Sequence, residues 1–89
     1  MDRKVNKQEL IRAIRYNIAA EFEAIQLYMQ LAESTDNKKA KAVLIDVANE
    51  EREHVGEFVT LLHELAPDEE NLYRKGKQEV EELFQELKK

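Results

Sequence analysis

The chain has 89 residues, enough for one small domain with only a modest core of its own. Its formal net charge of −5 argues against nucleic acid as a partner and favours cations. Because the sequence contains no cysteine, disulfides, thiolate zinc sites and iron–sulfur centres are excluded. No apolar run approaches the length of a membrane span, and the N-terminus lacks the apolar core of a signal peptide. We therefore expect a cytoplasmic protein that does not associate with membranes.

The first part of the chain has the pattern of one long helix followed by a turn. Asn6, with Glu9 three positions later, predicts a capping box at the start of a helix over about 8–34. The polar cluster that follows predicts a reversal of chain direction. Either Thr35 or Asp36 is expected to cap the next helix.

The rest of the chain has the pattern of one long helix and one short helix. The second helix is predicted over about 37–65 and ends before Pro67, because the residue before a proline avoids helical geometry. A third helix is predicted over about 68–88, broken near Gly76. With no strand pattern, the sequence predicts an all-α fold: an antiparallel helical hairpin plus a short C-terminal helix, in a single domain over 1–89.

Three ionisable residues interrupt the apolar stripes of the two long helices. Spacings of three and four residues place side chains on one face of a helix. Glu21 occupies one such position in the first helix, and Glu51 and His54 occupy two in the second. An uncompensated charge in an apolar interface is very costly, so something must neutralise these groups. The apolar members of the stripes are Ile11, Ile14, Ile18, Ile25, Tyr28 and Ala32, and then Ala40, Leu44, Val47, Phe58, Leu61 and Leu65.

Glu21 and Glu51 also lie at equal distances from the turn, fifteen residues on either side of Asp36. Each is therefore about 22 Å along its own helix, at about 1.5 Å per residue, and the two face each other in an antiparallel hairpin. Carboxylates with a neutral imidazole suit iron, manganese or zinc rather than calcium. We predict that Glu21, Glu51 and His54 are metal ligands.

The other ionisable residues nearby receive different assignments. His63 follows His54 by nine positions, about 180° around the helix, so we expect it on the surface. The neighbouring glutamates point off the stripes and are expected to be solvated, with outer metal sites as an alternative that stays open. They are Glu23, Glu50, Glu53 and Glu57.

The ligand count predicts the assembly. A bundle site for two irons takes a Glu from each of two helices and a Glu-x-x-His motif from each of two others. Glu21, Glu51 and His54 are half of that set, so two chains would supply all ligands and all four helices. We therefore predict a homodimeric four-helix bundle with a di-iron site on its twofold axis. Tyr28 lies on the same stripe as Glu21, and its hydroxyl would find a partner in a ligating carboxylate.

The segments Ala20–Tyr28 and Asp46–Phe58 resemble ferritin-like proteins of the encapsulated-ferritin type, above all the domains fused to encapsulin shell proteins. The shared spacing of Glu, Glu and His carries the resemblance, which covers the two long helices and part of the tail. It implies that Glu21, Glu51 and His54 hold the metal. It also implies that Tyr28 contacts a ligating carboxylate.

The resemblance further implies a function. Such proteins are ferroxidases whose di-iron site lies between two chains, often in a ring of five dimers, and they deliver iron into an encapsulin nanocompartment for storage. Glu23 matches an outer acidic site, whereas Ala20 stands where some members carry an acid. Residues 84–89 do not resemble a shell-docking tail, so the chain is either a domain cut from a fusion or one without a demonstrated link to a shell.

Two alternatives stay open at this point. One is a non-catalytic helical module that holds zinc or manganese. The other is a rubrerythrin-like di-iron peroxidase, which the lack of a cysteine-based electron relay disfavours.

Overall fold

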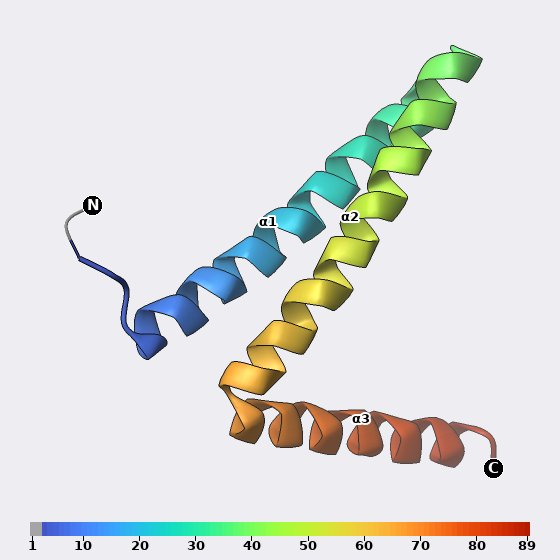
Figure 1. Ribbon diagram of the computed structural model, residues 1–89. Helices are drawn as coiled ribbons and strands as arrows, with labels where there is room; N and C mark the ends of the chain where they lie inside the picture. Colours follow the sequence, from blue (N-terminus) through green and yellow to red (C-terminus); the bar gives the residue numbers. More distant parts are fainter. Residues whose placement is uncertain (1–2) are drawn as a thin grey trace.

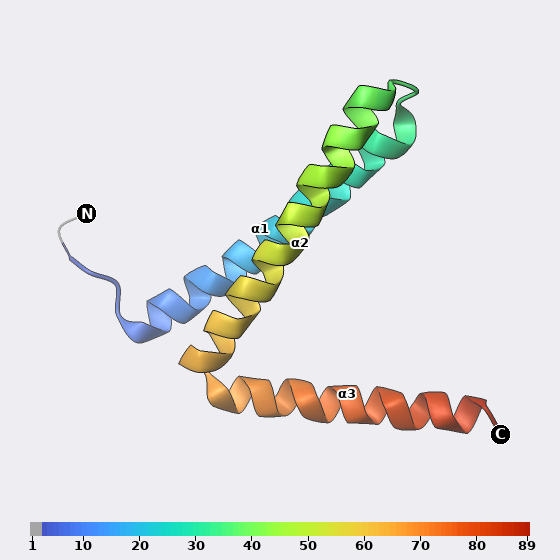
Figure 2. The same cartoon turned by 45° about the vertical axis from the view of Figure 1, so that its right-hand side comes forward.

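The computed structural model describes residues 3–89, and these residues form three helices. Helix α1 spans Lys7–Ser34, α2 spans Lys38–Leu65 and α3 spans Pro67–Leu87. Helices α1 and α2 lie side by side as an antiparallel hairpin, and α3 projects away from its base (Figure 1). The turned view in Figure 2 shows the same arrangement. Residues 3–89 contain no strand, so the predicted all-α class and helical hairpin are confirmed. Within this range no helix has both the length and the apolar composition needed to cross a bilayer.

The molecule is one helix layer thick, with Cα extents of 59 × 45 × 14 Å. Stable domains usually pack two layers around a core, and here one layer buries little. The main core cluster lies at the base of the hairpin, where Ile11 and Ile14 of α1 pack with Leu62 of α2. Many large apolar side chains stay exposed, among them Phe22, Leu27, Leu31, Val43, Leu72, Leu83 and Phe84.

The start of α1 confirms the predicted capping box. The side chain of Asn6 accepts a hydrogen bond from the backbone N–H of Glu9, at 2.9 Å. The Glu9 carboxylate accepts one from the backbone N–H of Asn6, at 3.0 Å, and forms an ion pair with Arg3. Two donors that the helix leaves without partners are thereby satisfied.

The start of α2 differs from the prediction, because Asn37 is the capping residue and not Thr35 or Asp36. The helix begins at Lys38, one residue later than expected, so the side chain that reaches the third helical N–H belongs to Asn37. It accepts a hydrogen bond from the backbone N–H of Ala40 at 3.0 Å. Thr35 instead accepts one from the backbone N–H of Asn37 within the turn, at 3.1 Å.

The predicted break near Gly76 is wrong, because α3 is one continuous helix of 21 residues. A single glycine costs a helix only about 1 kcal/mol relative to alanine, too little to end it. Pro67 stands at the first position, as expected, and three acids in the first turn complement the helix dipole. The pair Arg74–Glu70, at 2.8 Å, spans one turn on the N-terminal side of Gly76.

The apolar stripe of α2 also departs from the prediction at its far end. Leu62 is buried, with 3% of its surface exposed, whereas Leu61 is 41% exposed. A strict alternation of three and four residues averages 3.5 per turn and drifts about 20° per heptad against the real helix. Over three heptads the error moves the stripe by one residue. The same drift explains why His54 lies at the edge of the hairpin interface, with 49% of its side chain exposed.

We predict that the N-terminus of α1 loosens in acid because Glu9 protonates. The Arg3 guanidinium and the backbone N–H of Asn6 lower the pKa of Glu9 to about 2, from an ordinary value of 4.5. Since the folded-state pKa is depressed, this stabilisation is present above the ordinary value and is lost as the pH falls toward 2. The protection of the first-turn amides of α1, which is the ratio of the intrinsic to the observed exchange rate at each pH, should therefore decrease over that interval.

The matched variant Glu9→Gln keeps a capping side chain but cannot ionise. The protection of its first-turn amides against exchange should therefore not change as the pH falls from 4.5 toward 2. A Glu9 carboxyl that titrates near 4.5, as followed by NMR, would contradict the prediction.

Candidate metal centre

The hairpin brings Glu21 of α1 together with Glu51 and His54 of α2. The imidazole Nδ1 of His54 lies 3.5 Å from an oxygen of Glu21 and 3.6 Å from an oxygen of Glu51. One donor atom from each residue lies within 4.8 Å of the other two. Glu21 and Glu51 therefore lie at the same height along the hairpin, as their equal distances from the turn predict.

The burial of these groups is uneven. The side chains of Glu21 and Glu51 are each 19% exposed, whereas that of His54 is 49% exposed. One Glu21 oxygen, Oε2, is buried and has no hydrogen-bond partner within residues 3–89. A buried oxygen without a donor costs free energy. This oxygen is the one that lies 3.5 Å from Nδ1 of His54, and it accepts no hydrogen bond within residues 3–89.

The geometry fits a cation. Ligand atoms at about 2.1 Å from a tetrahedral ion lie about 3.4 Å apart, close to the two separations measured from His54. Two carboxylates and one imidazole are the donor types that iron, manganese and zinc accept. No second group of this kind occurs among residues 3–89. A metal ion held by these three residues would keep coordination positions for further ligands.

Beside the cluster lies a hollow of about 450 Å³ lined by Glu21, His54, Glu57 and Phe58. The sequence assigned Glu57 to the solvated face, and it is indeed exposed, yet it borders the hollow. Its position three residues after His54, about one turn further, was the signal that could have identified it. The Glu57 carboxylate adds negative charge to a hollow that Glu21 and His54 also line.

The remaining predicted positions are not part of the cluster. Tyr28 is partly buried, and within residues 3–89 its hydroxyl makes no hydrogen bond to Glu21 or Glu51, so its contact with a ligand stays a prediction. Glu23, Glu50 and Glu53 are exposed. Their assignment as outer metal sites or as solvated residues stays open.

His63 corrects one expectation. It faces away from His54, as its spacing requires, but it is not on the open surface. Its ring packs against that of Tyr73 in α3, with 5.6 Å between centroids, and its Nε2 is buried. This contact could not be predicted from the periodicity of α2, because it depends on the path that α3 takes.

Comparison with known proteins gives the family. The Rubrerythrin family model matches residues 13–88, which include all three residues of the cluster. The chain belongs to the rubrerythrin family. Its structure matches the crystal structure of the encapsulated ferritin domain from Pyrococcus furiosus with a TM-score of 0.90 at 41% identity. That match covers 93% of this chain and 85% of the other, which confirms the ferritin-like fold.

Two curated relatives of this rubrerythrin-family chain are associated by name with encapsulin. A ferritin-like–encapsulin shell fusion protein of Pyrococcus furiosus is 42% identical over 82 residues. The encapsulin nanocompartment cargo protein EncC of Myxococcus xanthus is 48% identical over 67 residues. The matches cover 92% and 75% of this chain but only 24% and 52% of those proteins. The chain thus spans about a quarter and about half of their lengths, and its resemblance to encapsulated ferritins is confirmed.

We predict that this rubrerythrin-family protein keeps or gains stability without metal when the two carboxylates become apolar. Glu21→Leu with Glu51→Leu removes two like charges that face each other and fills the hairpin interface. In chelator the variant should be as stable as the parent or more stable, by up to about 1–3 kcal/mol in the free energy of unfolding, which is the usual cost of one unpaired buried polar group. Its melting temperature should therefore equal or exceed that of the parent.

Glu23→Leu with Glu50→Leu is the matched control, since it removes two charges at exposed positions. Thermal unfolding followed by circular dichroism would decide. A large loss of stability only in the Glu21 and Glu51 variant would mean that these glutamates support the fold through polar contacts.

Proposed function

We propose that this protein is a ferroxidase, which oxidises Fe(II) to Fe(III) at a di-iron site completed by a second copy of the chain. The observation that carries the proposal is the convergence of Glu21, Glu51 and His54 within 4.8 Å at the open face of the hairpin. Membership of the rubrerythrin family supports iron as the metal.

The half-set of ligands supports a dimer. Two irons in a helical bundle need four carboxylates and two histidines, and one chain offers two and one. A second hairpin related by a twofold axis would bring the same set from the opposite side and cover the exposed apolar residues of the first. By analogy with encapsulated ferritins, we propose that five such dimers form a ring.

In this proposal iron is the substrate, and the chain supplies its ligands. Carboxylates stabilise the higher charge of Fe(III) more than that of Fe(II), so they favour loss of the electron. Each Fe(II) gives up one electron. The two electrons, with two protons from solvent, reduce one oxygen molecule to hydrogen peroxide, or one hydrogen peroxide molecule to two water molecules. The exposed edge of His54 and the hollow beside Glu57 leave a route for Fe(II) from solvent. Tyr28 would orient a ligating carboxylate through its hydroxyl.

The relatives support a location. Because one relative is a fusion with an encapsulin shell and another is an encapsulin cargo protein, we propose that this chain works inside an encapsulin compartment in the cytoplasm. There the oxidised iron would be stored as mineral.

The oxidation of Fe(II) tests the proposed ligands. Glu21→Ala, Glu51→Ala and His54→Ala should each lower the rate at which absorbance of Fe(III) develops after oxygen is added to anaerobically loaded protein. We expect a loss of at least about tenfold, because changes around a metal site commonly cost 10- to 100-fold. If the parent protein is instead a non-catalytic zinc or manganese module, Fe(III) should form in its presence no faster than in buffer that contains the same iron without protein.

His63→Phe is the control for this experiment, because it keeps an aromatic ring against Tyr73 and lies away from the cluster. Equal damage from His63→Phe and His54→Ala would contradict the site assignment. Replacing oxygen with hydrogen peroxide in the same assay tests the peroxidase alternative. A parent protein that reacts only with peroxide would favour it.

The stoichiometry tests the shared site. Native mass spectrometry of the iron-loaded protein should give a dimer or a larger even-numbered assembly, with about one iron per chain, because one chain holds half of the ligands. His54→Ala should reduce the iron count and shift chains toward the monomer. A monomer that holds iron tightly would contradict the shared site while leaving Glu21, Glu51 and His54 as ligands.

A further inference from the structure

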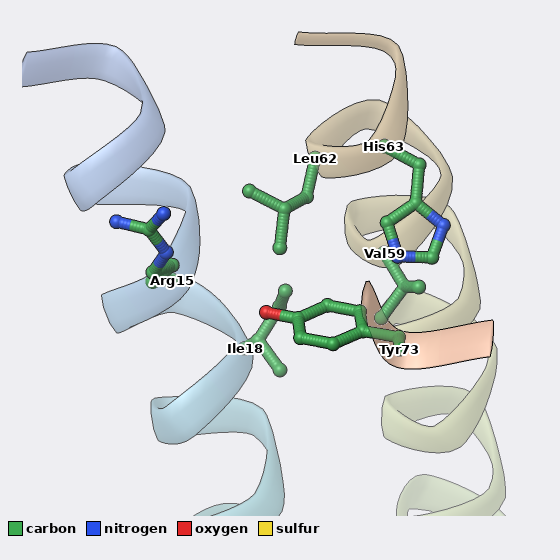
Figure 3. Close-up of a pocket in the computed structure, with 6 residues that line it drawn as sticks. All are labelled: Arg15, Ile18, Val59, Leu62, His63 and Tyr73. Atoms are coloured by element: carbon green, nitrogen blue, oxygen red, sulfur yellow. The ribbon is translucent and has the colours of Figure 1, made fainter. Parts of the chain in front are cut away.

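A second polar cluster lies at the elbow where α3 leaves the hairpin, and it joins all three helices. The Arg15 guanidinium of α1 donates two hydrogen bonds to the Glu69 carboxylate of α3, from Nε and Nη2, both at 3.1 Å. The Tyr73 hydroxyl, one turn along α3, donates to the same carboxylate. On its other side the Tyr73 ring packs against His63 of α2. In Figure 3 the Tyr73 ring lies across the elbow with its hydroxyl directed toward α1.

The charges in this cluster balance within one chain. Hydrogen bonds from Arg15, and then from Tyr73, lower the pKa of Glu69 below its ordinary value. The Glu69 carboxylate in turn raises the pKa of Arg15 and of Tyr73. Three groups thus hold one another in the protonation states that the hydrogen bonds require, and a paired guanidinium and carboxylate is the strongest common form of this contact.

Little else fixes the direction of α3. Ala66 is the single residue between the last residue of α2 and the first of α3. No residue of α3 is buried, and every residue from 71 onward is exposed. Among residues 3–89, the Arg15–Glu69 contact is the only side-chain hydrogen-bonded pair that joins α3 to the hairpin. Packing therefore leaves the angle of the helix weakly determined.

The space behind the cluster is hollow, not packed. A groove of about 250 Å³, open to solvent, lies between the three helices, with Ile18, Val59 and Leu62 as its apolar walls. Arg15, His63 and Tyr73 line the rest (Figure 3). Close-packed side chains resist displacement, and an open groove has no such side chains filling it. The polar contact of Arg15 with Glu69 therefore holds α3 at the edge of this groove.

We propose that Arg15, Glu69 and Tyr73 form a latch that sets the angle between α3 and the hairpin. With the latch closed, α3 extends in one direction and presents its exposed apolar side chains at a fixed position relative to α1 and α2. With the latch open, α3 turns about Ala66 and covers a range of directions. The latch acts at the base of the hairpin and does not involve the Glu21, Glu51 and His54 cluster.

Distances between spin labels test the latch directly. The 89-residue chain has no cysteine, so Lys41→Cys and Gln78→Cys place one label on α2 and one on α3, both at exposed positions. Labelled chains are diluted with unlabelled ones, so that double electron–electron resonance reports distances within one chain. The parent should give one narrow distance distribution.

Three variants separate the latch from its surroundings. Glu69→Gln keeps the shape of the side chain but loses the charge, and it should at least double the width of the distribution. Tyr73→Phe keeps the ring on His63 and should broaden it less. The control Glu70→Gln makes the same charge change one residue away, in the Arg74–Glu70 pair within α3, and should leave the width unchanged.

Reversal of the pair completes the test. Arg15→Glu alone should broaden the distribution, and Arg15→Glu with Glu69→Arg should restore the narrow one. A Glu69→Gln distribution as narrow as those of the parent and of Glu70→Gln would overturn the proposal. So would a parent distribution that is already broad, or a double reversal that fails to restore the narrow one while circular dichroism shows full helix content.

Discussion

Two carboxylates that face each other across an otherwise apolar helix pair constrain the rest of this molecule. Glu21 and Glu51 occupy positions where the stripes of α1 and α2 call for apolar side chains, and one Glu21 oxygen is buried without a donor. Burial without compensation is unfavourable for either group. The hairpin must therefore stay open on that face or receive positive charge there. Its one-layer shape and half-exposed His54 are consistent with both requirements.

The cluster at the elbow and the cluster in the middle of the hairpin differ in how their charges are paired. At the elbow, Arg15, Glu69 and Tyr73 satisfy one another, so the cluster is complete within one chain. In the middle of the hairpin, two carboxylates share one imidazole and no arginine or lysine is paired with them among residues 3–89. Structural ion pairs also occur in partly buried places, so burial alone does not distinguish a site. The balance of charge within the described chain does distinguish them, because among residues 3–89 the central cluster has two carboxylates without a guanidinium or an ammonium paired with them.

Much of this could be read from the sequence, for identifiable reasons. Apolar spacing located α1 and α2, and the equal distance of Glu21 and Glu51 from the turn placed them opposite each other. The errors occurred where a local pattern was not enough. Gly76 was given too much weight against the helix around it, and a 3.5-residue repeat put Leu61 where Leu62 belongs. The contacts of His63 and Arg15 with α3 were missed, because the path of a helix after a one-residue connection depends on tertiary contacts rather than on periodicity.

The position of the two clusters along the hairpin has a consequence for the order of folding. Glu21 and Glu51 are 30 positions apart in sequence, whereas Arg15 and Glu69 are 54 apart. Closing the longer loop costs about 0.5 kcal/mol more conformational entropy, and helix pairs joined by a short turn gain their contacts outward from that turn. The three residues of the central cluster therefore meet when the hairpin is only half closed. A hairpin that closes outward from its turn would assemble this centre before its base, and a cation bound at that stage would stabilise the partly closed hairpin.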